Sequence, residues 1–188
     1  TFAFLWVTYL GSKIGEDYLA VNTILMQFII FAAFFLDAYA FSTEGVVGFT
    51  IGRKVKNSFL TVVKNSIELS FITALIVSFL YIIFFKQIIN IITDIEMLRF
   101  ISYKHFLWVI LIPPIASFCY QLDGIFIGAS QTKEMRNAMI ISVISFIAIS
   151  IYLTKYFGNH GLWFSLMCFM ILRSLTLKFY FNRILRKF

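Results

Sequence analysis

Six apolar stretches separated by short polar connectors make up most of this chain. They cover residues 1–11, 18–41, 66–85, 105–127, 138–153 and 162–181, and the helical pattern of the second continues to about residue 50. An α-helix rises about 1.5 Å per residue, so about 20 apolar residues cross the hydrocarbon core of a bilayer. The pattern therefore predicts five full membrane spans and a partial span at the start. We expect the chain to begin partway through that first helix.

Composition strengthens the prediction of a membrane protein. Hydrophobic residues make up 61% of the sequence and charged residues 13%, whereas a soluble domain is about half apolar and about a quarter charged. We therefore expect an all-α integral membrane protein whose surface contacts the lipid bilayer. The net charge of +7 does not indicate nucleic-acid binding, because the basic residues cluster between the apolar stretches.

Charge alternates between successive connectors. The connectors after the second and fourth spans, together with the tail after the last span, contain nine basic residues and one acid, Glu134. The remaining three connectors contain five basic residues and four acids. Because basic connectors stay on the cytoplasmic side of a membrane, this bias predicts a cytoplasmic C-terminus.

Two acidic residues lie inside predicted spans, Asp37 in the second and Asp123 in the fourth. A charge at membrane depth costs at least about 2.5–3.5 kcal/mol, so such a residue usually faces the interior of a helix bundle or a watery cavity. Two such acids in a short chain favour a transport function over that of a passive anchor.

Asp37 belongs to a polar stripe along the second span. At 100° per residue, Asn22, Asp37 and Glu44 share one face of a straight helix. The opposite face carries Phe28, Phe31 and Phe35. The stripe indicates either a cation or proton site or a hydrogen-bonded seam between helices. Glu44 lies near the cytoplasmic end, where a basic residue such as Arg53 is a further possible partner.

The fourth span contains two features that shape a helix. Pro113 and Pro114 near its middle predict a kink that frees backbone carbonyls, and such broken helices are common, though not specific, in transporters. Gly124 and Gly128 are four residues apart, which permits the close approach of a second helix.

Asp123 has polar neighbours in the sequence that leave its role open. Tyr120 precedes it by three residues, and Arg136 begins the next predicted helix across a short loop. The sequence therefore predicts either a transport role for Asp123 or a structural Asp123–Arg136 ion pair. Arg173 and Lys178 are the basic residues within a span, and we expect both to extend toward the cytoplasmic face.

The remaining polar residues give no signature of an enzyme. His105 and His160 lie at span edges on the predicted outer side, where we expect them to be solvated or to cap helices, and His105 is suited to sense protons. The sequence contains no Ser/His/Asp arrangement, phosphate-binding loop or metal motif. We therefore expect no enzymatic activity, no metal and no cofactor.

Four blocks of sequence carry a family resemblance. They are LAVNTILMQ at 19–27, FLDAYAFSTE at 35–44 with Gly48 and Gly52, LDGIFIGA at 122–129 with EMRN at 134–137, and GNHGLW at 158–163. Together they resemble the multidrug and toxic compound extrusion (MATE) family, most closely its DinF-like branch. The resemblance covers nearly the whole chain and falls on the C-terminal lobe of that family.

This resemblance implies a twelve-helix exporter made of two six-helix lobes, located in the bacterial cytoplasmic membrane. The chain corresponds to helices seven to twelve, with the seventh truncated and the N-terminal lobe missing. Such proteins exchange small, often cationic, toxic compounds for inward protons or sodium ions. In the DinF-like branch the coupling acids are most often assigned to the missing lobe, so we do not expect this chain to transport alone.

Within this chain, the resemblance and the charge pattern together select a set of candidate residues. The candidates for cation coupling are Asp37, Glu44 and Asp123. The supporting polar residues are Asn22, Gln27, Tyr120 and Arg136, and the hinge candidates are Pro113 and Pro114. Two other functions remain as alternatives: a lipid-linked oligosaccharide flippase of the same superfamily, and a membrane scaffold subunit that transports nothing.

Overall fold

Long apolar segments fold as helices in a bilayer, because every backbone polar group there needs a partner within the protein. The computed structural model describes residues 2–188, and its regular structure is helical throughout. The helices are α1 (Phe2–Ile14), α2 (Glu16–Gly52), α3 (Lys56–Ile92), α4 (Glu96–Lys104), α5 (Phe106–Gly128) and α6 (Thr132–Leu185). Helices α2, α3, α5 and α6 are long and apolar enough to cross a membrane. The predicted all-α membrane fold is confirmed.

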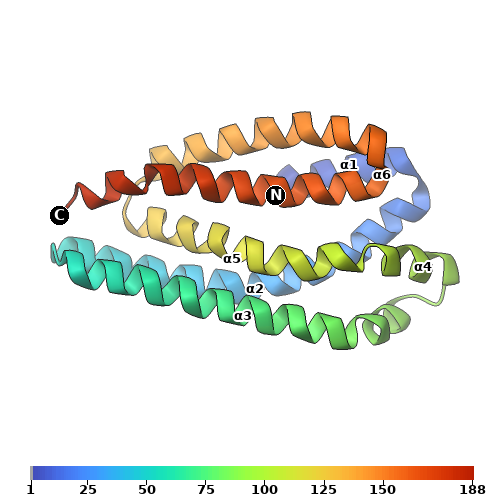
Figure 1. Cartoon of the computed structure of the whole chain (residues 1–188), viewed down its shortest axis with the longest axis horizontal. Helices are drawn as coiled ribbons and strands as arrows, with labels where there is room; N and C mark the ends of the chain where they lie inside the picture. The colour runs from blue at the N-terminus through green and yellow to red at the C-terminus, as the bar shows by residue number, and fades with distance from the viewer. Residues whose placement is uncertain (1) are drawn as a thin grey trace.

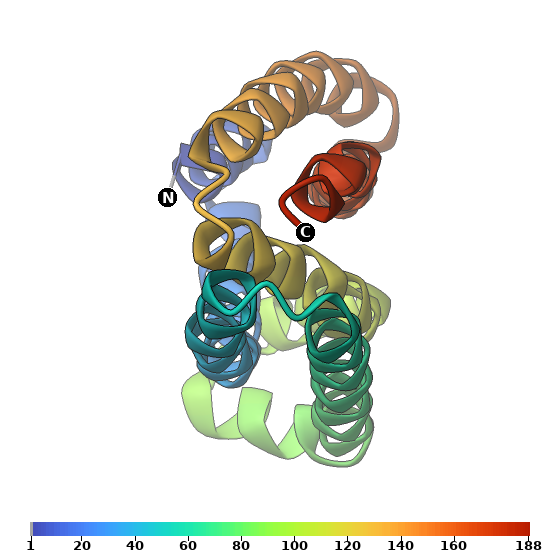
Figure 2. The same ribbon diagram turned by 90° about the vertical axis from the view of Figure 1, so that its left-hand side faces the viewer.

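Helix α5 occupies the centre of the bundle. It packs against α2 and α3 on one side and against α6 on the other, while α1 contacts both α2 and α6 (Figure 2). Its side chains Ile112, Ile125 and Phe126 are completely buried. Residues on this helix therefore meet protein on several sides, whereas α3 exposes a broad row of large aliphatic side chains.

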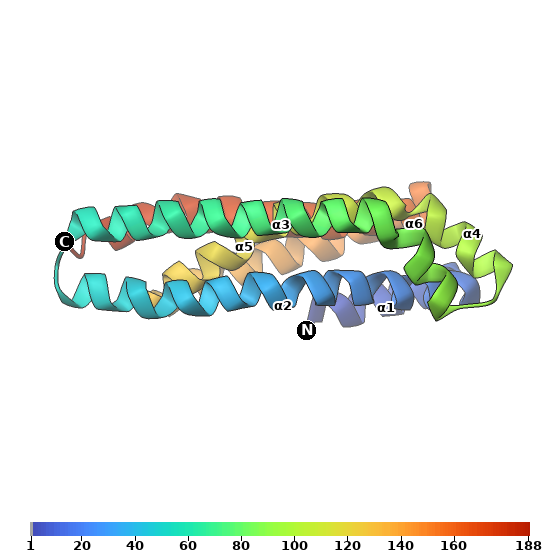
Figure 3. The same cartoon turned by 90° about the horizontal axis from the view of Figure 1, so that it is seen from below.

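The connectors lie at two opposite ends of the bundle. The α2–α3 and α5–α6 connections and the C-terminus share one end, and the α1–α2 connection, α4 and the middle of α6 share the other (Figures 1 and 3). The connectors with nine basic residues are thus gathered at a single end. This placement supports the predicted alternation of connectors, while the side of the membrane that each end faces stays a prediction.

Two features differ from the predicted pattern of spans. The short helix α4 lies in a segment that is predicted to be a connector. The pattern of apolar spans did not reveal it, because nine residues are too few to cross a membrane. The last two predicted spans form one assigned helix, α6, which is interrupted at Gly158 with φ 55° and ψ −135°. Only glycine readily adopts such a conformation, so this residue allows α6 to turn back along the bundle.

Candidate functional site

The seam between α2 and α5 is closed by two glycines. A methyl group added at Gly124 would overlap the Ala40 carbonyl, and one at Gly128 would overlap the Glu44 carbonyl. The predicted close approach at these glycines is confirmed. It brings the C-terminal half of α5 directly against the C-terminal third of α2.

Asp123 is paired with Arg173 of α6 within this packed region. Asp123 Oδ2 lies 2.7 Å from Arg173 Nη2, and each side chain is only 16% exposed. The alternative in which Asp123 pairs with Arg136 is wrong, because within residues 2–188 the Arg136 side chain hydrogen-bonds to Asn137 and forms no ion pair. Because Asp123 holds Arg173 inside the bundle, Arg173 does not extend freely into solvent; the side of the membrane toward which it points stays a prediction.

The ion pair leaves hydrogen-bonding capacity unused. Asp123 Oδ1 and Arg173 Nε are both buried without a partner among the described residues. Two residues before Asp123 on α5, Gln121 Oε1 accepts a 2.9 Å hydrogen bond from Thr43 of α2, and the Gln121 amide nitrogen is likewise buried and unpartnered. Buried polar atoms usually have a partner, so this cluster is equipped to bind a further polar group.

A cavity adjoins the ion pair. It has a volume of about 270 Å³ and lies between α1, α5 and α6. Its walls are formed by Phe2, Ala3, Phe4, Cys119, Tyr120, Met139, Val143, Leu166, Phe169, Met170 and Arg173. Apolar and aromatic side chains thus surround one phenol and one guanidinium group. Such a lining suits a small organic molecule.

Asp37 and Glu44 lie on α2 near this cluster and are half-buried. Asp37 lies within the range of electrostatic interaction with the Asp123 carboxylate. Neither Asp37 nor Glu44 forms an ion pair in the part of the chain that the structure describes. The cluster therefore combines two acids, Asp37 and Asp123, with one arginine.

Asn22 performs a different task from Asp37. It forms a reciprocal amide pair with Asn159 of α6, at 2.7 and 2.9 Å, and accepts a 2.8 Å hydrogen bond from Trp163 Nε1. Asn22 and Asp37 are also separated along α2 by 15 positions, or about 22 Å. The stripe thus divides into a hydrogen-bonded seam at Asn22 and a candidate ion site at Asp37.

The prolines of α5 create a backbone acceptor that α3 satisfies. Pro114 has no N–H to bond the carbonyl four residues earlier, at Ile110. Ser78 of α3 donates a 2.8 Å hydrogen bond to that carbonyl. The predicted release of carbonyls thus becomes a specific contact between helices, while a hinge role for Pro113 and Pro114 stays a prediction.

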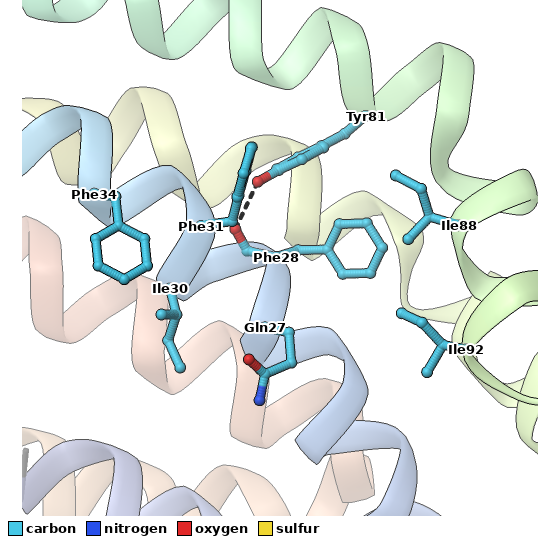
Figure 4. Close-up of a pocket in the computed structure, with 8 residues that line it drawn as sticks. All are labelled: Gln27, Phe28, Ile30, Phe31, Phe34, Tyr81, Ile88 and Ile92. Carbon is cyan, nitrogen blue, oxygen red and sulfur yellow. Dashed lines mark hydrogen bonds between the residues drawn. The ribbon is translucent and has the colours of Figure 1, made fainter.

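Gln27 lines a separate apolar pocket between α2 and α3 (Figure 4). Phe28 lies in the wall of the same pocket and is buried, and its carbonyl accepts a 2.6 Å hydrogen bond from Tyr81. Of the three Phe residues opposite the polar stripe, Phe31 and Phe35 are exposed and Phe28 is buried. Curvature and tilt of a 37-residue helix change which residues face the bundle along its length.

The two histidines form a contact that the sequence did not predict. The rings of His105 and His160 stack with centroids 4.2 Å apart, and Trp108 donates a 3.0 Å hydrogen bond to His160 Nδ1. His105 is buried rather than solvated. The contact joins the start of α5 to the break in α6, at the end of the bundle opposite the basic connectors.

Arg173 is the site residue whose role the sequence interpretation missed. Intramembrane charges nearly always pair, and Asp123 and Arg173 are both charged residues within predicted spans. That rule offered a signal for the pair. The separation of 50 positions hid it, because Arg136 was a closer partner in sequence.

The chain is similar to a known protein family and to one of its characterised members. Residues 1–154 match the MatE family. DNA damage-inducible protein F of Escherichia coli (strain K12) is 34% identical to the chain over 171 residues. The match covers 91% of this chain and 37% of that protein, so the chain spans little more than a third of the length of this relative. No solved structure matches the chain.

Proposed function

Because this chain belongs to the MatE family, we propose that it forms one lobe of a secondary transporter that exports small organic compounds. Export is coupled to inward movement of protons or sodium ions, and the second lobe completes the transport pathway. The observation that carries this proposal is the buried Asp123–Arg173 pair beside the 270 Å³ cavity. Buried intramembrane ion pairs typically mark ion or substrate pathways.

In the proposed mechanism, the charge on Asp123 determines which conformation is favoured. While Asp123 is ionised, it holds Arg173 and so ties α5 to α6. A proton or sodium ion that neutralises Asp123 weakens this tie and leaves Arg173 free for another partner. A ligand shifts a conformational equilibrium only through such a difference in affinity between states. Asp37, whose charge interacts with Asp123, raises the affinity of the site for a cation.

A lipid-linked oligosaccharide flippase is less well supported. Such a protein needs a positively charged cavity for a pyrophosphate group. Arg173 does line the cavity, but Asp123 neutralises its charge, and the other ten residues of the lining carry no charge. Accumulation of lipid-linked substrate after Arg173→Gln would favour the flippase over the exporter.

The proposal is tested with the complete protein in proteoliposomes. We would load a fluorescent cation such as ethidium and follow its movement after imposing a proton gradient, and separately a sodium gradient. Wild type, Asp37→Asn and Asp123→Asn are compared with Glu68→Gln as a control, since Glu68 forms an exposed ion pair with Lys64. We expect the Asp123 variant to lose gradient-driven export and the control to keep it. No movement of the cation with either gradient in the wild type would contradict the exporter.

A further inference from the structure

A second cavity lies at the end of the bundle opposite the basic connectors. It has a volume of about 540 Å³ and lies between α1 and the part of α6 that precedes the break at Gly158. Its polar and aromatic lining consists of Trp6, Tyr9, Lys13, Thr154 and Lys155. It shares no residue with the cavity beside Asp123.

The charge of this cavity is purely positive. Lys13 and Lys155 both line it, and no acidic residue does so. Neither lysine forms an ion pair within residues 2–188. The ammonium group of Lys13 lies 4.5 Å from the centre of the Tyr9 ring, which holds it at the cavity wall. Two free ammonium groups at one cavity favour an anionic ligand.

A buried hydroxyl group adds a hydrogen-bonding site. Thr154 Oγ1 is inaccessible to solvent and has no partner among the described residues. Threonine hydroxyls in helices commonly bond the carbonyl one turn earlier, as Thr176 does to Leu172 in the same helix. The Thr154 hydroxyl is therefore an unpaired polar group behind the wall of the cavity, and a ligand reaches it only after the Thr154 side chain rotates.

The long dimension of the cavity suits a lipid rather than a free ion. Trp6 and Lys13 are seven residues apart on α1, which corresponds to about 10 Å along the helix axis. Trp6 faces this cavity with its indole N–H bonded to Ser150 at 2.9 Å. Aliphatic side chains from α1 and α6 complete the wall. A lining that combines lysines with aromatic and aliphatic side chains is typical of the membrane interface.

We propose that this cavity binds the phosphate head group of an anionic phospholipid. Lys13 and Lys155 contact the phosphate oxygens, and the acyl chains leave along Trp6 toward the bilayer core. The bound lipid joins α1 to α6 directly before its break at Gly158. This inference does not depend on the proposed transport function, because it concerns residues that the coupling site does not use.

Native mass spectrometry of the complete detergent-solubilised protein tests this site. Dioleoyl phosphatidylglycerol and dioleoyl phosphatidylcholine are titrated separately onto the wild type and onto Lys13→Gln/Lys155→Gln. The matched control is Lys86→Gln/Lys104→Gln, which removes two exposed lysines from the same end of the bundle but outside this cavity. Melting temperatures without added lipid confirm that all three proteins are folded.

We expect the wild type and the control to bind phosphatidylglycerol more tightly than phosphatidylcholine. The Lys13/Lys155 variant should bind phosphatidylglycerol about thirtyfold more weakly, because each lysine near an anionic lipid contributes about a factor of five. Equal affinity of the wild type for both lipids would overturn the proposal, as would unchanged binding in that variant. Full displacement of phosphatidylglycerol by millimolar inorganic phosphate would assign the cavity to a free anion instead.

Discussion

At the scale of single residues, the Asp123–Arg173 pair is the most consequential contact in the chain. Both groups are largely buried, and removal of one partner leaves the other charge uncompensated. Loss of one partner of a buried ion pair costs about 3–5 kcal/mol, whereas replacing both by apolar groups can be neutral. The contribution of the Asp123–Arg173 pair to stability is therefore measured by comparing the unfolding free energies of the single and double variants.

We predict strong coupling between these two residues in a double-mutant cycle. Asp123→Leu and Arg173→Met should each lower the free energy of unfolding of the complete protein by about 3 kcal/mol or more. The free energy of unfolding lost in the double variant should be markedly smaller than the sum of the losses in the two single variants. Denaturant unfolding in detergent measures all four proteins, and losses that add to within about 0.5 kcal/mol would show that the pair is not coupled.

His105 supplies a second residue-scale prediction. It lies between α4 and α5, outside the membrane-spanning helices. Burial lowers its pKa from the ordinary value of 6.5, against the opposing effect of its hydrogen bond to Ile101, and His160 and Lys104 lower the pKa further. The unfolded chain therefore binds a proton more readily, so stability falls as the pH drops below about 6.5.

The melting temperature of the complete protein, measured from pH 8 to pH 5, checks this sign. We expect a decrease below about pH 6.5 that is smaller in His105→Gln, which keeps a polar side chain but cannot titrate in this range. His160→Gln serves as a comparison because it removes the exposed ring of the stacked pair. A pH profile of His105→Gln that matches the wild type would contradict the assignment.

At the scale of helices, the α2–α5 seam depends on the absence of side chains. Gly124 meets the backbone of Ala40, and backbone atoms cannot move aside as a flexible side chain can. We predict that Gly124→Ala lowers the free energy of unfolding by about 1–3 kcal/mol. Gly45→Ala is the control, because no atom lies within 4 Å of the added methyl group, and it should gain up to about 1 kcal/mol of helix propensity.

Thermal unfolding of both glycine variants in detergent separates the cost of backbone overlap at position 124 from the gain in helix propensity of alanine over glycine. If Gly124→Ala were as stable as Gly45→Ala, the two helices would not be in backbone contact at this position. The glycine spacing at 124 and 128 was recognisable in sequence because small residues four positions apart lie on one helix face. The residues of α2 that these glycines contact could not be recognised in the sequence, since the sequence does not determine how the partner helix is rotated.

Helix boundaries and partners show a similar limit. Hydrophobicity indicated where the spans lie, but it did not reveal α4, whose nine residues include two buried aliphatic side chains, Leu98 and Ile101. It also did not reveal the hydrogen bond from Ser78 to Ile110. The proline pattern predicted a free carbonyl, but the donor comes from a helix whose packing is decided by the tertiary fold.

At the scale of the whole molecule, the family resemblance carried by the four sequence blocks is confirmed by the match to the MatE family. The membrane-spanning helices were accessible from hydrophobicity because it acts over long stretches of sequence; the side of the membrane that each connector faces stays a prediction. The partner of Asp123 was not accessible, because a residue 50 positions away becomes its neighbour only after α6 turns back at Gly158.

The cavity beside Asp123 and the cavity beside Lys13 have different chemical characters. The one between α1, α5 and α6 adjoins an ion pair and is otherwise apolar, which suits exchange of a cation and an organic substrate. The one before the break in α6 is lined by two unpaired lysines, which suits a lipid phosphate. We propose that coupling and lipid binding therefore occupy separate parts of the same lobe.

We propose that Asp123 couples ion movement to export, and counterflow separates this role from substrate binding. In proteoliposomes of the complete protein, ethidium exchange without any ion gradient reports substrate binding and conformational change, and gradient-driven export reports coupling. We predict that Asp123→Asn retains counterflow but loses gradient-driven export. If Asp123→Asn retained both activities, or lost both together, Asp123 would not be the coupling residue.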